Sequence, residues 1–200
     1  MQRNLLPIIE DIQHGRPIII VDGMDRENEG DLMIAAEMAT TFNIAFMCRY
    51  GRGIMCLPTS GEVLDRLEIP MMVQNSTDPL QTPFTISVDA AVGVTTGVSA
   101  SDRVETMKVL TNSLSIPTDL ARPGHLFPLR ARPGLLTERR GHTEASVTLV
   151  NMLAFAPVAV ISEIMNDDGT MARLPELRVF AAYHRLKILS IDDLCNITGV

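Results

Sequence analysis

The sequence predicts a layered α/β fold, an α+β arrangement in which a mixed β-sheet core is flanked by helices. Short apolar, β-branched runs alternate along the chain with stretches of helical periodicity. Several connections are too short for the helical crossover that parallel pairing needs, so some strands are expected to pair antiparallel. With 200 residues, 46% of them hydrophobic and 20% charged, residues 1–200 are expected to form a single domain.

An amphipathic helix is predicted over residues 4–14, where apolar side chains recur at helical spacing and a glycine follows. The apolar positions are Leu5, Ile8, Ile9 and Ile12, and the glycine is Gly15. The next run, residues 17–21, is short, apolar and β-branched, which is typical of a strand buried on both faces.

Strands and helices are predicted in alternation along the rest of the chain. The further strands span residues 31–36, 53–57, 84–91, 125–131, 158–165 and 187–191. The further helices span residues 41–50, 61–67, 102–114, 143–154 and 175–186. A capping-box pattern from Ser99 to Asp102 begins the helix over 102–114, and its apolar stripe consists of Val104, Met107, Leu110 and Leu114.

The densest group of candidate functional residues lies between the first two strands. Carboxylates occupy every odd position of this segment: Asp25, Glu27, Glu29 and Asp31. If the segment is extended, all four point to one side. Crowded carboxylates raise one another's pKa or require a cation, and oxygen ligands suit Mg²⁺ or Mn²⁺ better than zinc. The alternative is a solvated acidic turn, which the flanking apolar strands disfavour.

A second candidate group spans residues 139–144, at the start of the helix over 143–154. Arg139 can bind a phosphate through two parallel hydrogen bonds, and Gly141 allows close approach to the backbone. Thr143 and the N–H groups of the first helical turn complete an anion site. His142 is a candidate metal ligand or general acid and base. The alternative is an ordinary basic loop in which Thr143 caps the helix.

Isolated polar residues supply the remaining candidates. Thr96 lies in a hydroxyl-rich turn that either binds a ligand or caps the next helix. Glu163 lies inside an apolar run, where a carboxylate must be paired, metal-bound or protonated. His125 follows a Pro-Gly pair, and its alternative reading is a hydrogen-bonded, partly buried histidine. Cys56 ends a predicted strand and is either a nucleophile or a small core residue.

Composition excludes several classes of protein. A net charge of −7 disfavours nucleic-acid binding, which depends on clustered Lys and Arg. Three cysteines without a C-x-x-C pair are too few for a disulfide scaffold and indicate the reducing cytoplasm. The longest apolar run, residues 152–161, is too short to span a bilayer, and the N-terminus lacks the apolar core of a signal peptide. No membrane or nucleic-acid partner is expected.

Taken together, five segments resemble the 3,4-dihydroxy-2-butanone 4-phosphate synthases of riboflavin biosynthesis. The segments are DRENEGDL (25–32), GVTTGVSASDR (93–103), PGHLFPL (123–129), RRGHTE (139–144) and EIMNDDGTMAR (163–173). They occur in the order of the family, and the resemblance extends from about residue 5 to residue 191. Because the five segments occur together, the alternative explanations given above for single segments can no longer be considered separately.

The resemblance implies a lyase that converts D-ribulose 5-phosphate to L-3,4-dihydroxy-2-butanone 4-phosphate and formate. The implied route passes through a metal-stabilised enediolate, dehydration, a skeletal rearrangement and loss of C4. The implied cofactor is Mg²⁺ or Mn²⁺, with two ions per site when substrate is bound, and the implied assembly is a homodimer. Losing C4 requires proton movements around adjacent oxygens, which suits a site rich in carboxylates beside a Lewis acid.

The resemblance also implies a role for each candidate residue. Glu27 and His142 correspond to the metal ligands. Arg26 and Asp31 correspond to sugar contacts, and Arg139 and Thr143 to phosphate contacts, with Arg140 and Gly141 beside them. His125 and Glu163 correspond to residues essential for catalysis, with Asp31 as a further proton carrier. Thr96 and Cys56 correspond to residues that line the substrate pocket.

Two other functions stay open at this stage. One is a catalytically silent homologue that binds a sugar phosphate, and the other is an unrelated Mg²⁺-dependent phosphatase. Members of the family can be fused to GTP cyclohydrolase II, of which this sequence has no trace, so a monofunctional enzyme is expected. We also expect a site shared between two chains, with His125 projected from the edge of its subunit by a rigid turn at Arg122-Pro-Gly124.

Overall fold

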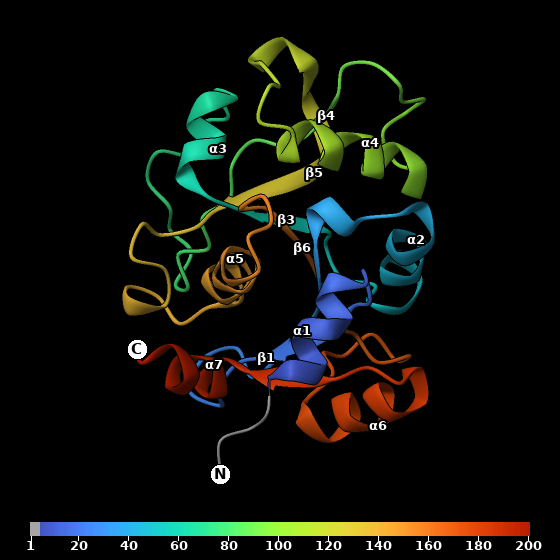
Figure 1. Ribbon diagram of the computed structural model, residues 1–200, viewed down its shortest axis with the longest axis vertical. Coiled ribbons are helices and arrows are strands. Elements are labelled where there is room, and N and C mark those ends of the chain that lie inside the picture. The colour runs from blue at the N-terminus through green and yellow to red at the C-terminus, as the bar shows by residue number, and fades with distance from the viewer. Residues whose placement is uncertain (1–4) are drawn as a thin grey trace.

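Seven strands form one mixed sheet in the computed structural model, which describes residues 5–200 (Figure 1). The strands are β1 (Ile18–Val21), β2 (Gly30–Ala35), β3 (Cys56–Thr59), β4 (Val88–Ala90), β5 (Leu120–Arg130), β6 (Ala159–Glu163) and β7 (Ile188–Ser190). Their order across the sheet is β4-β5-β3-β6-β2-β1-β7. The pairs β1·β7 and β3·β5 are parallel and the other four pairs are antiparallel, which confirms the predicted mixed sheet.

Helices cover both faces of this sheet. They are α1 (Leu6–Gln13), α2 (Thr41–Tyr50), α3 (Gly61–Arg66), α4 (Ala100–Thr111), α5 (His142–Met152), α6 (Leu174–His184) and α7 (Ile191–Thr198). Single 3₁₀ turns occupy Ala36–Met38, Pro117–Asp119 and Leu135–Thr137. Figure 1 shows α2, α4 and α6 on one side and α5 and α7 on the other.

Alternation along β2 divides the apolar side chains between two cores. Leu32 and Ile34 pack with α2, α3, α4 and α6, whereas Met33 and Ala35 pack with α1, α5 and α7. Asp31 has the same parity as Met33, and Glu163 has the same parity as Ile161, which also packs in the second core. Both carboxylates therefore lie on the face that α5 covers.

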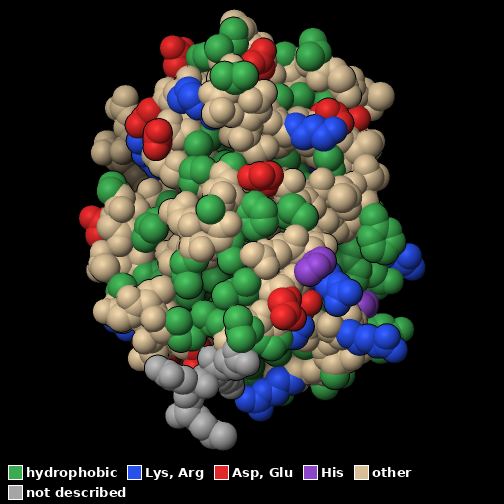
Figure 2. Space-filling model, in the orientation of Figure 1, with side chains coloured by type: hydrophobic (Ala, Val, Ile, Leu, Met, Phe, Trp, Pro, Cys, Tyr) green, Lys and Arg blue, Asp and Glu red, His purple; other side chains and the backbone are tan. Residues whose placement is uncertain are grey.

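Aromatic side chains join α2 to α6 on the opposite side of the molecule. The ring of His184 lies 4.4–5.2 Å, between centroids, from four aromatic rings, those of Phe46, Tyr50, Phe180 and Tyr183. On the face drawn in Figure 2, Lys and Arg side chains gather over α6, while Asp and Glu are spread over the rest. Exposed Arg178 and Arg185 come from this helix and its C-terminus.

Several predicted elements differ from the structure in their limits. The strand expected over 53–57 is β3, which begins at Cys56 and ends at Thr59. Of the strand expected over 84–91 only Val88–Ala90 is a named strand, because residues 84 and 85 form isolated bridges. The first residue of the helix expected over 4–14 lies outside the described residues.

Two other predictions about helices were wrong. Leu114 does not belong to the stripe of α4, because the helix ends at Thr111 and Leu114 is exposed. The strand predicted over 187–191 includes residue 191, but this residue begins α7, a helix that the sequence pattern does not predict. The Ser190 hydroxyl accepts a hydrogen bond from the Asp193 N–H at 3.1 Å and caps this helix, and Asp192 and Asp193 suit its first turn.

Within the described residues, no helix is both long and apolar enough to cross a membrane. The three cysteines, Cys48, Cys56 and Cys195, are free thiols.

Candidate active site

A tight turn after β1 carries most of the acidic segment, so the prediction of an extended segment with all carboxylates on one side was wrong. Residues 24–27 form the turn, and Asn28 follows in the left-handed conformation with φ 54°. The cause is Asp22. Its carboxylate accepts hydrogen bonds from the backbone N–H groups of Glu27 (3.0 Å) and Glu29 (2.8 Å) and from the guanidinium of Arg26 (2.8 Å).

Asp22 was not among the predicted site residues. Its side chain is only 1% exposed, and its carboxylate forms an ion pair with Arg26 at 2.8 Å. The available sequence signal was its position directly after a buried strand, before a glycine and the acidic segment. Asp22 shapes the backbone of this turn and so fixes where Arg26 and Glu27 project.

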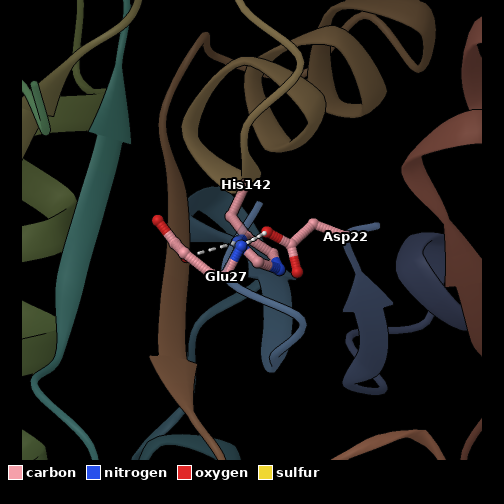
Figure 3. Close-up of side chains that lie close together, drawn as sticks. All are labelled: Asp22, Glu27 and His142. Atoms are coloured by element: carbon pink, nitrogen blue, oxygen red, sulfur yellow. Dashed lines mark hydrogen bonds and ion pairs between the residues drawn. The ribbon is translucent and has the colours of Figure 1, made fainter. Parts of the chain in front are cut away.

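The turn brings Glu27 to His142, the first residue of α5 (Figure 3). A Glu27 carboxylate oxygen lies 3.4 Å from His142 Nδ1, and the other lies 2.8 Å from the Arg26 guanidinium. Burial acts to raise the pKa of Glu27, but the hydrogen bond with His142 and the charge of Arg26 outweigh it and lower that pKa. Burial acts to lower the pKa of His142, but the charge of Asp31 and the contact with Glu27 raise it to about 9.

Asp31 and Glu163 are direct cross-strand neighbours in β2 and β6. Burial, together with the negative charges around them, raises the pKa of both carboxyl groups. Glu163 ends β6 rather than lying inside the strand, and its carboxylate occupies the space that a Cβ atom at Gly53 would need. Burial also raises the pKa of the Cys56 thiol, with a smaller contribution from the charges of Glu163 and Asp31, which disfavours the nucleophilic thiolate at this position.

Three buried polar atoms of this group have no hydrogen-bond partner: Asp31 Oδ1, His142 Nε2 and Glu163 Oε2. Buried polar atoms are rarely left in this state unless a ligand or water completes them. One ligand atom from each of Asp22, Glu27 and His142 lies within 4.8 Å of the others. Carboxylate oxygens with one imidazole fit a divalent cation, and Mg²⁺ and Mn²⁺ prefer oxygen ligands.

An open hollow of about 650 Å³ adjoins this turn, and four arginine side chains line it. Its lining includes Arg26, Arg132, Arg139 and Arg140, with Leu80 and Gln81 from the long loop before β4. Arg139 forms a buried ion pair at 2.7 Å with Glu144, which is completely buried in the first turn of α5. The same hollow is also lined by Glu138, so four guanidinium groups face one carboxylate, an excess of positive charge that favours an anionic ligand.

The start of α5 is shaped by Gly141. Gly141 itself is the N-cap residue, so the alternative in which Thr143 caps the helix is wrong. A Cβ atom at this position would overlap Arg139 Nη1 and crowd the guanidinium of Arg26, so a larger residue would displace the ends of both arginine side chains from their present positions. Thr143 is buried in the first turn, and Arg140 is exposed.

His125 and Thr96 form a second group around β4. The imidazole of His125 is 47% exposed and contacts Asp89 at 2.6 Å, and the N–H of Thr96 donates to Asp102 at 3.2 Å. The rigid turn expected at residues 122–124 is wrong, because β5 begins at Leu120 and runs through these residues. Among the described residues, His125 makes no hydrogen bond or ion pair with the carboxylates around His142.

A buried histidine among carboxylates, beside a hollow lined by arginines, is typical of enzymes that bind a phosphorylated substrate together with a divalent cation. Residues 7–197 match the family model for 3,4-dihydroxy-2-butanone 4-phosphate synthase, and the chain belongs to this family.

Relatives and solved structures agree with this assignment. The chain is 52% identical over 188 residues to the monofunctional riboflavin biosynthesis protein RIBA 2, chloroplastic, of Arabidopsis thaliana, covering 93% of this chain and 40% of that protein. It is 50% identical over 188 residues to the 3,4-dihydroxy-2-butanone 4-phosphate synthase of Agrobacterium fabrum, covering 94% and 88%. It spans about half the length of several other relatives, such as the 3,4-dihydroxy-2-butanone 4-phosphate synthase of Neisseria meningitidis serogroup A, with 52% covered.

The crystal structure of a 3,4-dihydroxy-2-butanone 4-phosphate synthase in complex with two magnesium ions is also similar. It superimposes with a TM-score of 0.91 at 39% identity, covering 97% of this chain and 95% of that one. This similarity over nearly the whole chain confirms the predicted fold class.

Proposed function

We propose that this chain is a carbon–carbon lyase that converts D-ribulose 5-phosphate to L-3,4-dihydroxy-2-butanone 4-phosphate and formate, within riboflavin biosynthesis. The observation that carries the proposal is the junction of an arginine-lined hollow with a group of buried carboxylates whose oxygens lack partners. A sugar phosphate needs both parts, an anion site for its phosphate and proton carriers beside its hydroxyl carbons. The names of relatives at about 50% identity support the same reaction.

Glu27 and His142 would hold the divalent cation, and Asp22 would offer a further carboxylate oxygen within 4.8 Å of their ligand atoms. The fit rests on their mutual proximity and on the unpartnered Nε2 of His142. We propose Mg²⁺ or Mn²⁺, with two ions per site when substrate is bound; the similar crystal structure is described as a complex with two magnesium ions, which supports Mg²⁺. When bound, such a cation polarises adjacent oxygens and stabilises negative charge on them.

The phosphate is assigned to Arg139, Thr143 and the N–H groups at the start of α5. Glu144 accepts a hydrogen bond from Arg139 Nη1 at 2.7 Å, and the carbonyl of Leu80 accepts one from Nη2 at 3.4 Å, so the guanidinium is held at the edge of the hollow and has further N–H groups for an anion. Gly141 gives the anion access to the backbone, and Arg140 adds positive charge at the rim of the hollow. Arg26 lies between this hollow and Glu27, and so it is placed to contact the sugar.

Proton transfers are assigned to Asp31, Glu163 and His125. The raised pKa values of Asp31 and Glu163 bring their titration closer to neutral pH, where a carboxyl group can both accept and donate a proton. Oδ1 of Asp31 and Oε2 of Glu163 are the atoms available for this purpose, because both lack a partner. Cys56 and Thr96 are proposed to line the pocket.

One assay distinguishes this function from the alternatives. Incubating the protein with D-ribulose 5-phosphate and Mg²⁺ is expected to release formate without inorganic phosphate. Release of inorganic phosphate would instead support a phosphatase. Release of neither product, from folded protein, would support a catalytically silent sugar-phosphate-binding homologue.

Replacing Arg139 with Lys is expected to weaken substrate binding by about 1–3 kcal/mol, because lysine keeps the charge but loses the planar fork of donors. The measurement is KM for formate release. Arg130→Lys is the matched control, since Arg130 pairs with exposed Asp65 outside the hollow around Arg139 and Arg140. An unchanged KM in Arg139→Lys would place the phosphate elsewhere.

We further propose that the enzyme is a cytoplasmic homodimer. The free thiols suit a reducing compartment. Sedimentation of the purified chain would test the dimer.

A further inference from the structure

Asp89 holds His125 at two points. One carboxylate oxygen accepts the backbone N–H of His125 at 2.9 Å, and the other lies 2.6 Å from the ring nitrogen Nδ1. The side chain of Asp89 is 10% exposed, and that of His125 is 47% exposed. A carboxylate can only accept, so the ring must donate from Nδ1. The second ring nitrogen, Nε2, is therefore the one left to act on another molecule.

The backbone around this pair is built for close contact. A Cβ atom at Gly124 would overlap the backbone of Val88 and Asp89, so that glycine at this position lets β5 press against β4. The register between the two strands shifts at the same place, between Val88 and Asp89. This close approach places the carboxylate of Asp89 against His125, the residue directly after Gly124.

A clamped loop covers the bond between the two side chains. A Cβ atom at Gly97 would overlap Asp89 Oδ2 and crowd His125 Nδ1, and Gly97 has a φ of +87°. One carboxylate oxygen of buried Asp102 accepts the N–H groups of Thr96 (3.2 Å) and Gly97 (3.0 Å). Asp102 thus holds the loop over the hydrogen bond between Asp89 and His125. A hydrogen bond that is shielded from water is stronger than an exposed one, so it restrains the orientation of the imidazole ring more firmly.

We propose that Asp89 is the positioning residue of His125: it fixes the tautomer with the proton on Nδ1, and it orients the ring so that Nε2 faces the substrate as the proton-transferring atom. Among the described residues, Asp89 forms no ion pair with Lys or Arg. A buried carboxylate that pairs with one half-exposed imidazole matches the base-and-orienter arrangement of catalytic sites. The catalytic part of this proposal rests on the proposed function.

The tautomer can be measured directly by ¹⁵N–¹H NMR of the imidazole rings. The chain has four histidines, and His125→Asn identifies the resonances of His125. In the unsubstituted protein, neutral His125 is expected to carry its proton on Nδ1. Asp89→Ala is expected to move the proton to Nε2 in a large fraction of molecules. Asp89→Asn offers one acceptor oxygen for two donors, so it is expected to give a smaller shift, and it keeps the volume of the side chain.

Measurements of kcat and KM distinguish a positioning role of Asp89 from a purely structural one. Asp89→Ala is expected to lower kcat for formate release by about 10- to 100-fold with KM changed less than about threefold, by analogy with the loss seen when the hydrogen-bond partner of a metal-bound histidine is removed. Asp89→Asn is expected to lie in between. Asp65→Ala, which removes an exposed carboxylate of α3, is the matched control for both measurements.

The two measurements fail in distinguishable ways. A proton that stays on Nδ1 in both Asp89 variants would overturn the proposal, whatever the kinetics. A proton that moves while kcat stays unchanged would also overturn it, because the orientation would then have no catalytic use. Absence of formate release from the unsubstituted protein would overturn the proposed function instead, and the NMR result would still decide whether Asp89 orients His125.

Discussion

Chelation of divalent cations is expected to abolish formate release, and added Mg²⁺ is expected to restore it. The reason lies in the group of Asp22, Glu27 and His142, whose ligand atoms lie within 4.8 Å of one another, and in His142 Nε2, which has no hydrogen-bond partner. A site of this kind lowers its electrostatic energy by binding a cation. Formate is measured with and without excess chelator, and then after readdition of Mg²⁺ or Mn²⁺. Full activity in excess chelator would show that no metal takes part.

Glu27→Gln is expected to reduce formate release by orders of magnitude. Glutamine retains the size of the side chain but lacks the negative charge, and only a carboxylate can pair with both Arg26 and His142 as Glu27 does. Glu62→Gln, which removes an exposed carboxylate from the first turn of α3, is the control. Binding of Mg²⁺ should be measured in parallel by calorimetry. Unchanged Mg²⁺ affinity in Glu27→Gln would show that Glu27 is not a ligand.

The parts of the site that the sequence predicts best are contiguous in the chain. Residues 139–144 supply an arginine, a glycine and a histidine to one helix N-terminus, and the structure places all of them there. Local geometry is sufficient at such a place, because the free N–H groups of a helix lie where its first residues are. The cross-strand contact between Asp31 and Glu163 depends on register, and the spacing of the individual strands does not reveal it.

The errors arise where contacts outside a sequence pattern override the conformation that the pattern favours. Alternating carboxylates suggested an extended segment, but Asp22 accepts backbone N–H groups and bends residues 24–27 into a turn. The Pro-Gly pair before His125 suggested a turn, but Gly124 instead lets two strands come into contact. Both outcomes depend on contacts outside the pattern itself. The contact is made by Asp22, which precedes the acidic segment, in the first case and by strand β4 in the second.

Mixing two inactive variants is expected to restore activity if each site draws residues from two chains. In the described chain, the Asp89–His125 pair belongs to β4 and β5 at one edge of the sheet, whereas Glu27 follows β1 near the other edge. Neither group bonds to the other. A half-exposed imidazole that is held rigidly, with Nε2 unused, is suited to complete the site of a second copy. The position of the Asp89–His125 pair therefore favours a composite site, although residues 122–124 do not form a turn.

The experiment mixes Glu27→Gln chains with His125→Ala chains under conditions that exchange subunits, with exchange confirmed by mass spectrometry. Random pairing makes about half of the dimers mixed, and one of the two sites in each mixed dimer carries neither lesion, so roughly a quarter of all sites should recover. The control mixture combines Glu27→Gln with His142→Ala. Those two residues contact each other within one chain, so every site retains at least one lesion and no recovery is expected. If the first mixture also stays inactive, His125 and Glu27 serve the same site from the same chain, because each mixed site would then still carry one substitution.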